Sequence, residues 1–262
     1  MVPKLELAGI RKQFSFAGKT LPVLEGVDLS VEEGEFVSVI GPSGCGKSTL
    51  LNIMAGLEEP DQGTLCMDGA DAAGRLGKVG YMPQKDLLLP WRNVLDNTIL
   101  GPELQGVSRS RARQQALGLM ERFGLKGFEG HYPFLLSGGM RQRAALLRTV
   151  LAGRDVILLD EPFGALDALT RSRLQEWLLE LWSGLGKTMV LVTHDVDEAT
   201  LLSDRVYVLT ARPGRVKMVM PVALPRPRTL DMVTQPAFLS LKASLMTALR
   251  EEDLRAQEEP WR

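Results

Sequence analysis

The chain has 262 residues, of which 45% are hydrophobic and 24% charged, as in an ordinary globular protein with a substantial core. Its formal net charge is -1, from 31 Lys and Arg against 32 Asp and Glu, so it lacks the basic excess that drives non-specific binding to nucleic acid. We therefore expect no nucleic-acid partner.

The sequence contains no apolar run near the roughly 18 to 20 residues that a membrane-spanning helix needs, and residues 1–9 lack the apolar stretch of a signal peptide. Two cysteines, Cys45 and Cys66, are too few for a disulfide framework and have no metal-ligand spacing. We expect the chain to be made and kept in the cytosol.

The first third of the chain predicts strands, a glycine-rich loop and a helix. Residues 23–31 alternate apolar and polar side chains, and residues 36–40 form a continuously apolar strand. A glycine-rich loop follows at once, and apolar residues at helical spacing continue from Ser48 until Gly56. Short strands are predicted over 64–68 and 79–82.

The middle of the chain changes character. Residues 86–150 carry long polar side chains and few β-branched ones, with a clear helix over 109–123, which predicts an inserted helical subdomain. Buried strands over 155–160 and 188–193 flank an amphipathic helix over 166–182, an alternation typical of a parallel sheet covered on both faces.

The last third predicts a hairpin and a helical tail. Strands over 205–210 and 215–220 are joined by Arg212-Pro213-Gly214. In the tail, Leu241, Leu245 and Leu249 are spaced by four; we expect them to pack against their own domain rather than lie on a membrane. The expected domains are an α/β core over 1–85 and 151–220, a helical subdomain over 86–150 and a C-terminal helical tail over 221–262.

Residues 41–48 match the P-loop (Walker A) pattern between a strand and a helix, where that pattern has meaning. Glycines let backbone N–H groups turn toward phosphate oxygens, and the helix N-terminus adds about half a positive charge. We expect Lys47 to bind the β- and γ-phosphates, Ser48 to offer its hydroxyl to Mg²⁺, and Thr49 to add a phosphate contact. The candidate nucleotide-binding residues of this segment are Gly41, Pro42, Ser43, Gly44, Cys45, Gly46, Lys47, Ser48 and Thr49.

Cys45 has two readings in this loop. A helix N-terminus can lower the pKa of a thiol and make it reactive, or the side chain simply fills a variable loop position.

A second acidic motif narrows the choice among P-loop proteins. The apolar residues 156–159 lead into Asp160 and Glu161. A carboxylate at the end of a buried parallel strand can hold Mg²⁺, the role expected of Asp160, and Glu161 is the candidate general base that polarises the attacking water. The Asn-Lys-x-Asp guanine motif is absent from the sequence, which argues against a GTPase.

Residues 136–140, Leu-Ser-Gly-Gly-Met, resemble the signature motif of ABC ATPases, and the order of the motifs is the specific part of the resemblance. Phe14 resembles the aromatic residue that stacks on adenine, although it could instead belong to the core. Gln84 resembles the Q-loop glutamine, residues 164–167 the D-loop, and His194 the switch histidine.

The resemblance implies a P-loop NTPase fold, of mostly parallel sheet with flanking helices, an N-terminal antiparallel β portion and an inserted helical subdomain. It also implies hydrolysis of ATP with Mg²⁺. Ser137, Gly138 and Gly139 begin a helix and can bind an anion; in the family, each signature faces the ATP held by the other subunit of a head-to-tail dimer. The implied catalytic residues are Glu161, His194 and Gln84, and the implied magnesium ligands are Ser48, Gln84 and Asp160.

Several segments resemble the branch that imports nitrate, sulfonates, taurine and related small compounds, and these are 89–92, 140–143, 161–167 and 212–214. Met140 replaces the common Gln and Phe14 the common Tyr, and neither change removes a catalytic group. The branch implies a peripheral motor at the cytoplasmic face of the inner membrane. Its partners would be transmembrane permease subunits, near residues 91–94, and indirectly a periplasmic or surface solute-binding protein.

Three alternatives stay open from the sequence: a soluble ABC ATPase in nucleic-acid transactions, a regulatory cassette that binds ATP without turnover, and the ATPase of an exporter. The transported solute is not readable. The sequence also predicts that Arg141, Arg143 and Arg148 form a solvated face of the signature helix.

Overall fold

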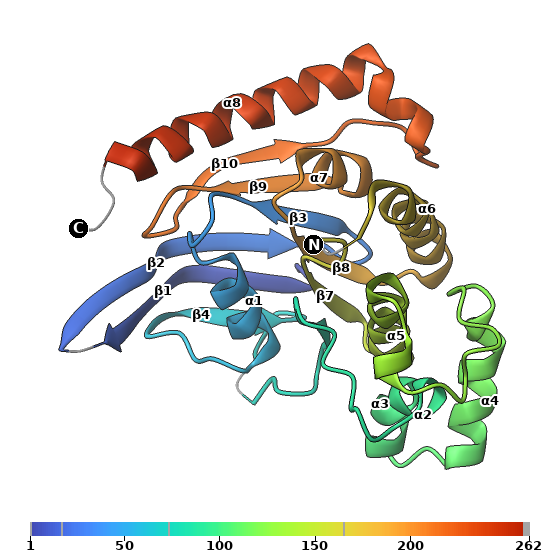
Figure 1. Cartoon of the computed structure of the whole chain (residues 1–262). Helices are drawn as coiled ribbons and strands as arrows, with labels where there is room; N and C mark the ends of the chain where they lie inside the picture. The colour runs from blue at the N-terminus through green and yellow to red at the C-terminus, as the bar shows by residue number, and fades with distance from the viewer. Residues whose placement is uncertain (1, 17, 73, 165, 259–262) are drawn as a thin grey trace. The chain divides into compact units, whose positions relative to one another are not determined.

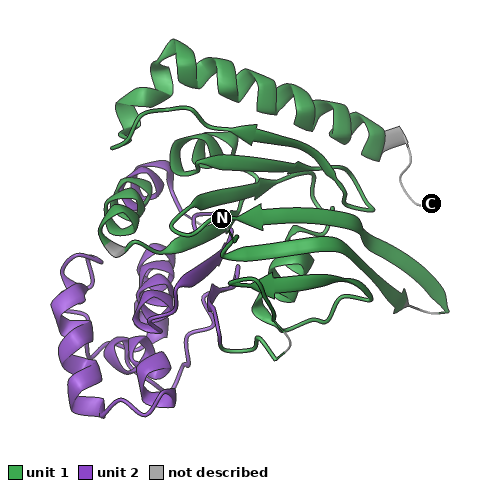
Figure 2. Ribbon diagram, turned by 180° about the vertical axis from the view of Figure 1, so that it is seen from behind, with its two compact units in different colours: residues 1–77, 175–262 green, residues 78–174 purple. Residues whose placement is uncertain are grey.

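The chain divides into two compact units (Figure 2). The computed structural model describes residues 2–16, 18–72, 74–164 and 166–258. Unit 1 consists of residues 1–77 and 175–262, and unit 2 of residues 78–174. The helical subdomain predicted over 86–150 lies within unit 2.

Unit 1 contains an antiparallel sheet in the order β2-β1-β4-β5. Its strands are β1 (Leu5–Phe16), β2 (Lys19–Val31), β4 (Gln62–Met67) and β5 (Ala70–Asp71). The pairing of β1 with β2 shifts register between Leu7 and Ile10, where Gly9 has a φ of 62°. Such a bulge breaks the alternation of side chains, and the sequence pattern for this reason did not predict β1 as a separate strand.

The second set of strands in unit 1 is mostly parallel. β3 (Phe36–Ile40) pairs in parallel with both β8 (Thr188–Val192) and β9 (Arg205–Leu209), and β10 (Val216–Pro221) pairs antiparallel with β9. Every residue of β3 and β8 is buried, as their continuous apolar sequences predict. The hairpin predicted around Arg212-Pro213-Gly214 is confirmed as β9 and β10.

The helices of unit 1 include α1 (Lys47–Ala55), α7 (Val196–Leu202), the short η2 (Leu230–Thr234) and α8 (Pro236–Glu258). α8 runs along β9, β10 and α7 (Figure 1). Its side chains Phe238 and Leu245 are fully buried, and Lys242 Nζ donates to Asp197 Oδ2 of α7 at 2.8 Å. The tail helix therefore packs against its own unit, as predicted; tail residues 259–262 lie outside the described residues.

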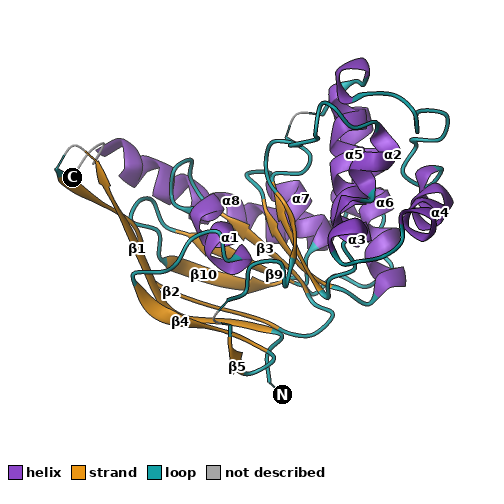
Figure 3. Cartoon of the chain, turned by 90° about the horizontal axis from the view of Figure 1, so that it is seen from below, coloured by secondary structure: helices purple, strands orange, loops and turns teal. Residues whose placement is uncertain are grey.

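Unit 2 combines the parallel pair β6 (Gly80–Met82) and β7 (Val156–Asp160) with a group of helices, which Figure 3 draws in purple. These helices are α2 (Val94–Thr98), α3 (Leu100–Leu104), α4 (Arg109–Met120), η1 (Pro133–Leu135) and α5 (Gly138–Leu151). Ile99, Ala112 and Ala116 form a fully buried cluster among them. α6 (Ala168–Leu185) begins in unit 2 and ends in unit 1.

The two kinds of sheet and the helical segment confirm the predicted fold class, a P-loop NTPase α/β core with an antiparallel β portion and an inserted helical part. Within the ranges that the structure describes, no helix combines the length and the apolar content that crossing a membrane requires.

Candidate nucleotide site

The P-loop connects the end of β3 to the start of α1, the strand-loop-helix context that the sequence predicts. Gly44 and Gly46 have φ values of 75° and 104°, which favour glycine. A Cβ on Gly46 would also lie 2.7 Å from Leu24 Cδ2. The backbone conformation and the contact with Leu24 are two independent constraints that require glycine at position 46.

Lys47 places a buried positive charge inside this loop. Its side chain is only 8% exposed, and Nζ donates to the carbonyl oxygens of Gly41 and Pro42 at 2.8 and 2.9 Å. The ammonium is thus held inside the loop by neutral acceptors, with no carboxylate in the bonds that fix it. A positive charge placed beside turned-in backbone and a helix N-terminus fits a phosphate chain.

Cys45 is buried in the same loop, with Sγ 3.8 Å from Lys47 Nζ. Burial raises the pKa of the Cys45 thiol despite the nearby ammonium of Lys47. Because the thiolate is the reactive form, this environment favours the reading in which Cys45 fills a loop position.

Phe14 lies on β1 and is 38% exposed, so it is not a core residue. Lys12 Nζ lies 5.3 Å from the centroid of its ring, and the same ammonium donates to the carbonyl oxygen of Glu59 and pairs with Glu58. These contacts hold Lys12 against the ring and leave Phe14 with exposed aromatic surface, as stacking on a base requires.

His194 follows β8 and the P-loop follows β3. β3 and β8 are parallel neighbours with Val39 opposite Val192, so both segments lie at the same carboxyl edge. The His194 side chain is exposed. Its place at this edge of unit 1 agrees with the switch role that the resemblance implies.

The backbone on both sides of His194 is fixed by hydrogen bonds. Asp195 caps α7, its Oδ1 accepting from the amides of Asp197 and Glu198 at 2.8 and 3.1 Å. Thr193 Oγ1 donates to the buried carboxylate of Glu198 at 2.5 Å and accepts from the amide of Asp195 at 3.0 Å. These bonds hold the histidine position rigidly.

In unit 2, Gln84 and Glu161 are directly bonded, although the sequence placed them in separate motifs. Gln84 Nε2 donates to Glu161 Oε2 at 3.1 Å. Glu161 has a φ of 46°, and its carbonyl oxygen accepts from the amide of Gly164 at 3.2 Å. A non-glycine residue in this left-handed conformation costs about 1 kcal/mol or more, and such strain is concentrated at functional sites.

Asp160 ends β7 and is only 3% exposed. Burial, and then the nearby Asp160 carboxylate, raise the pKa of Tyr81 on the neighbouring β6 above its usual range. A buried carboxylate at the end of a parallel strand, next to the strained Glu161, is the local arrangement predicted for a magnesium ligand followed by a base.

The signature residues begin α5, with Ser137 as the N-cap. Ser137 Oγ accepts from the amide of Met140 at 3.3 Å. A Cβ on Gly138 would meet nothing closer than Arg141 at 3.9 Å, whereas one on Gly139 would lie 3.2 Å from Leu166. The Gly138 side of the helix start is therefore open. In the D-loop, Asp167 Oδ1 accepts from the amide of Thr170 at 3.0 Å, and Ala165 lies outside the described residues.

The predicted solvated face of the signature helix is wrong. Arg141 Nε donates to Asp86 Oδ2 at 3.0 Å, and the Arg148 guanidinium donates to the carbonyl oxygens of Asp86 and Leu87 at 2.6 and 2.7 Å. Burial lowers the pKa of both Arg143 and Arg148. Arg141 and Arg148 therefore tie α5 to the loop that follows Gln84. Their spacing of seven residues places both on one face of the helix, and this spacing was the sequence signal that could have indicated a shared partner.

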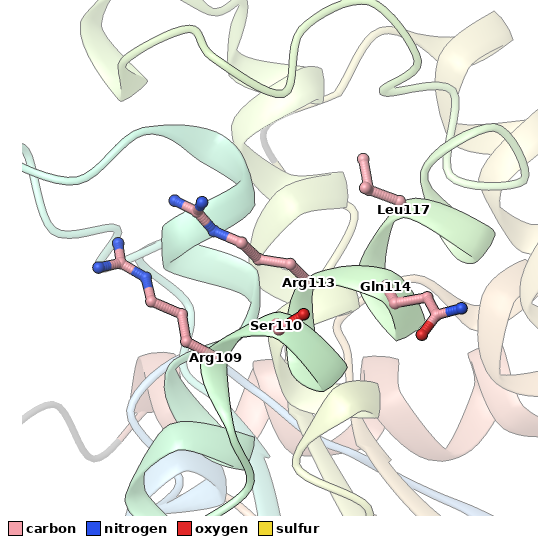
Figure 4. A pocket seen from close by; sticks show the side chains of 5 residues that line it. All are labelled: Arg109, Ser110, Arg113, Gln114 and Leu117. Carbon is pink, nitrogen blue, oxygen red and sulfur yellow. The ribbon is translucent and has the colours of Figure 1, made fainter.

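A hollow of about 430 Å³ lies along α4 (Figure 4). Its lining residues are Arg109, Ser110, Arg113, Gln114 and Leu117. Both guanidiniums donate to the carboxylate of Asp96, at 2.7 Å. Because Asp96 pairs with both arginines, we assign no ligand to this hollow.

The comparisons with known proteins all match ABC transporter ATP-binding proteins, over more than half of the chain in each case. A family model described as ABC transporter matches residues 24–164. An uncharacterized ABC transporter ATP-binding protein of Methanocaldococcus jannaschii is 44% identical over 98% of this chain and 95% of its own length. A formylaminopyrimidine import ATP-binding protein of Halalkalibacterium halodurans is 43% identical, covering 93% of this chain and 97% of its own. An aliphatic sulfonates import ATP-binding protein of Bacillus licheniformis is 43% identical, covering 90% of each.

Among solved structures, the dimeric structure of a bacterial ABC transporter cassette superposes with a TM-score of 0.76 at 32% identity. It covers 84% of this chain and 100% of the cassette. A second structure of that cassette, a post-hydrolysis state bound to ADP and phosphate, gives a TM-score of 0.75 at 31% identity.

Proposed function

The chain belongs to the ABC transporter family as an ATP hydrolase coupled to transport, and from this premise we propose that it powers an importer for a small solute. One observation carries the proposal: relatives named as import ATP-binding proteins match 90% or more of the chain at 43% identity. The names of these two relatives give different solutes, a formylaminopyrimidine and aliphatic sulfonates. The proposed solute is nitrate, a sulfonate, taurine or a related small compound, as the resemblance of the sequence to that branch implies.

The P-loop is the proposed site for the triphosphate. Lys47 exchanges its bonds to the carbonyl oxygens of Gly41 and Pro42 for phosphate oxygens, a gain because the new acceptors are charged. The other loop residues from Gly41 to Thr49 except Pro42, which has no N–H, are proposed to supply backbone amides, and Ser43, Ser48 and Thr49 add hydroxyls. Phe14 is proposed to stack on the base.

Mg²⁺, when bound, neutralises charge on the phosphates. Ser48, Asp160 and Gln84 are the proposed residues that hold it, and all three offer the oxygen ligands that this ion prefers. Asp160 is buried at the end of β7, where such a ligand is expected.

Glu161 is the proposed general base for the attacking water. The bond that Gln84 Nε2 donates to Glu161 Oε2 at 3.1 Å orients the carboxylate that is proposed to take the proton of water. His194, whose backbone is held by Thr193 and Asp195, is proposed to contact the γ-phosphate and keep the water in line.

The proposed assembly contains two copies, arranged head to tail, so that Ser137, Gly138 and Gly139 of each copy face the ATP bound by the other. The dimeric form of the structurally similar cassette supports this arrangement. The dimer is proposed to bind permease subunits at the cytoplasmic face of the membrane. A solute-binding protein would act on it only indirectly, through the permease.

The test is solute uptake in the native host after disruption of the gene, with complementation by the wild type, by Glu161→Gln or by Glu176→Gln. Glu176 is an exposed residue of α6, so its substitution is the matched control. We expect lost uptake of labelled taurine, an alkanesulfonate or nitrate, restored by the wild type and the control but not by Glu161→Gln.

ATP hydrolysis by the purified chains is measured beside uptake. We expect phosphate release by Glu161→Gln to fall by about 10² to 10⁴, the usual contribution of a general base. Unchanged uptake of every solute together with slowed efflux of a compound would overturn the importer proposal. Wild-type phosphate release by Glu161→Gln would overturn the base assignment alone.

A further inference from the structure

The C-terminal helix α8, which runs along β9 and β10 (Figure 1), is hydrogen-bonded to the turn that joins these two strands. Glu252 is 1% exposed, and its Oε2 accepts from the amide of Ala211 at 3.0 Å. The other oxygen, Oε1, pairs with Lys217 Nζ at 2.8 Å and with Arg255 at 3.0 Å. A buried carboxylate with these partners holds the start of the turn firmly.

The same turn is bonded to the P-loop. Arg212 Nε donates to the carbonyl oxygen of Gly44 at 3.1 Å. Two residues later, a Cβ on Gly214 would collide with the carbonyl oxygen of Cys45, so the turn backbone lies directly against the loop backbone. The Gly214 amide also donates to the carbonyl oxygen of Val23 at 2.8 Å.

The bond from Arg212 acts on a peptide group within the proposed phosphate-binding loop. The Gly44 carbonyl belongs to the same peptide unit as the Cys45 amide, which donates to the carbonyl oxygen of Pro42 at 3.3 Å. A cation bonded to the carbonyl polarises the whole unit and makes its N–H a stronger donor. The guanidinium also adds a positive charge beside a site that binds an anion.

We propose that Arg212 and Glu252 are positioning residues for ATP binding: Arg212 braces the outer side of the P-loop, and Glu252 holds the turn that carries Arg212. The proposal rests on the proposed role of the P-loop as the triphosphate site. In this proposal α8 acts on the nucleotide site indirectly: Glu252 binds the Ala211 amide, and the next residue, Arg212, binds the P-loop. By thermodynamic linkage, ATP bound in the loop must in turn stabilise the turn and the end of α8.

The first experiment compares the KM for ATP of two arginine variants, of which only one loses a contact with the P-loop. Arg212→Ala removes the bond to Gly44, whereas Arg215→Ala, on the same turn, removes an exposed bond to Glu25. We expect the KM for ATP of Arg212→Ala to rise about three- to tenfold with kcat nearly unchanged, since one charge-assisted bond is lost. Arg215→Ala is expected to keep the wild-type KM.

The second pair tests α8. Glu252→Ala removes the bond to Ala211, and Glu251→Ala removes a neighbouring bond to the same Lys217 without touching the turn. We expect a raised KM for Glu252→Ala only. Glu252→Gln keeps an oxygen for the Ala211 amide and is expected to restore most of the affinity. In the double variant with Arg212→Ala, the KM is expected to rise no further than in Arg212→Ala alone.

Hydrogen exchange supplies a readout that a purely structural role would not move. Saturating ATP should slow exchange of the Ala211 amide in the wild type and in Arg215→Ala, but not in Arg212→Ala. Arg212 is exposed, so its substitution leaves the core intact. The Arg212→Ala variant therefore tests the proposed brace even if Glu252→Ala does not fold.

Equal KM values for Arg212→Ala and Arg215→Ala, with equal ATP-dependent protection of Ala211, would overturn this inference. Lys47→Ala separates it from the proposed nucleotide site. A loss of ATP binding in Lys47→Ala with no effect of Arg212→Ala rejects only the brace. Wild-type ATP binding in Lys47→Ala rejects the P-loop assignment, on which both depend.

Discussion

At the scale of single residues, Asp96 shows how arginine donors compensate the burial of a carboxylate. Asp96 is buried in unit 2 and accepts from Arg109 and from Arg113. Burial alone would raise the pKa of Asp96, but the bonds from Arg113 and Arg109 outweigh it and lower the pKa below its usual value. The charged carboxylate therefore stabilises the folded chain.

The sign of the pH dependence follows from this lowered pKa. The contribution of Asp96 to the free energy of unfolding is fully present above the pKa of the unfolded chain, about 3.9. It is lost as the pH falls through the pKa of Asp96 in the folded chain, which is lower. We expect Asp96→Asn to lower the free energy of unfolding by about 1 to 3 kcal/mol at neutral pH. The same substitution should weaken the fall of stability between about pH 5 and pH 3.

Urea unfolding at several pH values measures this effect, with Asp231→Asn as the control because Asp231 is exposed on η2. The prediction is wrong where Asp96→Asn and the control show the same pH slope.

Residue roles that depend on local sequence could be predicted, and those that depend on distant contacts could not. The fold of the P-loop around Lys47 follows from a pattern that lies within eight residues. The bond of Arg141 to Asp86 joins residues 55 positions apart, and that of Gln84 to Glu161 spans 77. Neither partner can be identified without the fold, so Arg141 was placed in solvent.

At the scale of elements, strands with continuous apolar sequence were predictable, whereas bulged strands and helix partners were not. β3 agrees with its predicted range because all five residues are buried on both faces. β1 was missed because register shifts interrupt its alternation. For α8, the spacing of the leucines predicted a buried face but not that β9, β10 and α7 would be the partners.

The buried face of α8 gives a prediction at this scale. Leu245 is fully buried, whereas Leu239 of the same helix is 49% exposed. We expect Leu245→Ala to lower the free energy of unfolding by about 2 to 5 kcal/mol, through lost apolar burial and a cavity. Leu239→Ala should change it by less than about 0.5 kcal/mol. Urea denaturation followed by circular dichroism measures both, and equal effects would show that α8 is not packed as described.

At the scale of the whole molecule, the sequence predicts a dimer of two copies of this chain. The chain carries one P-loop and one signature, and the open side of Gly138 offers a helix start with space for a ligand. The family relationship and the similar dimeric cassette support pairing of two copies. We predict that this dimer forms only while ATP is bound. Its formation therefore depends both on the proposed role of Glu161 in hydrolysis and on the proposed contact of the signature residues with the partner's ATP.

Light scattering in MgATP tests it. Glu161→Gln should retain ATP and double in mass, whereas the wild type should return to monomer as ATP is consumed. Adding Gly138→Glu should abolish the dimer, because a carboxylate would face the phosphates of the partner's ATP, while ATP binding to the monomer persists. Gly118→Glu is the matched control: a Cβ there also meets nothing within 4 Å, and Gly118 lies in α4. A dimer that tolerates Gly138→Glu as well as Gly118→Glu would show that the signature does not contact the partner's nucleotide.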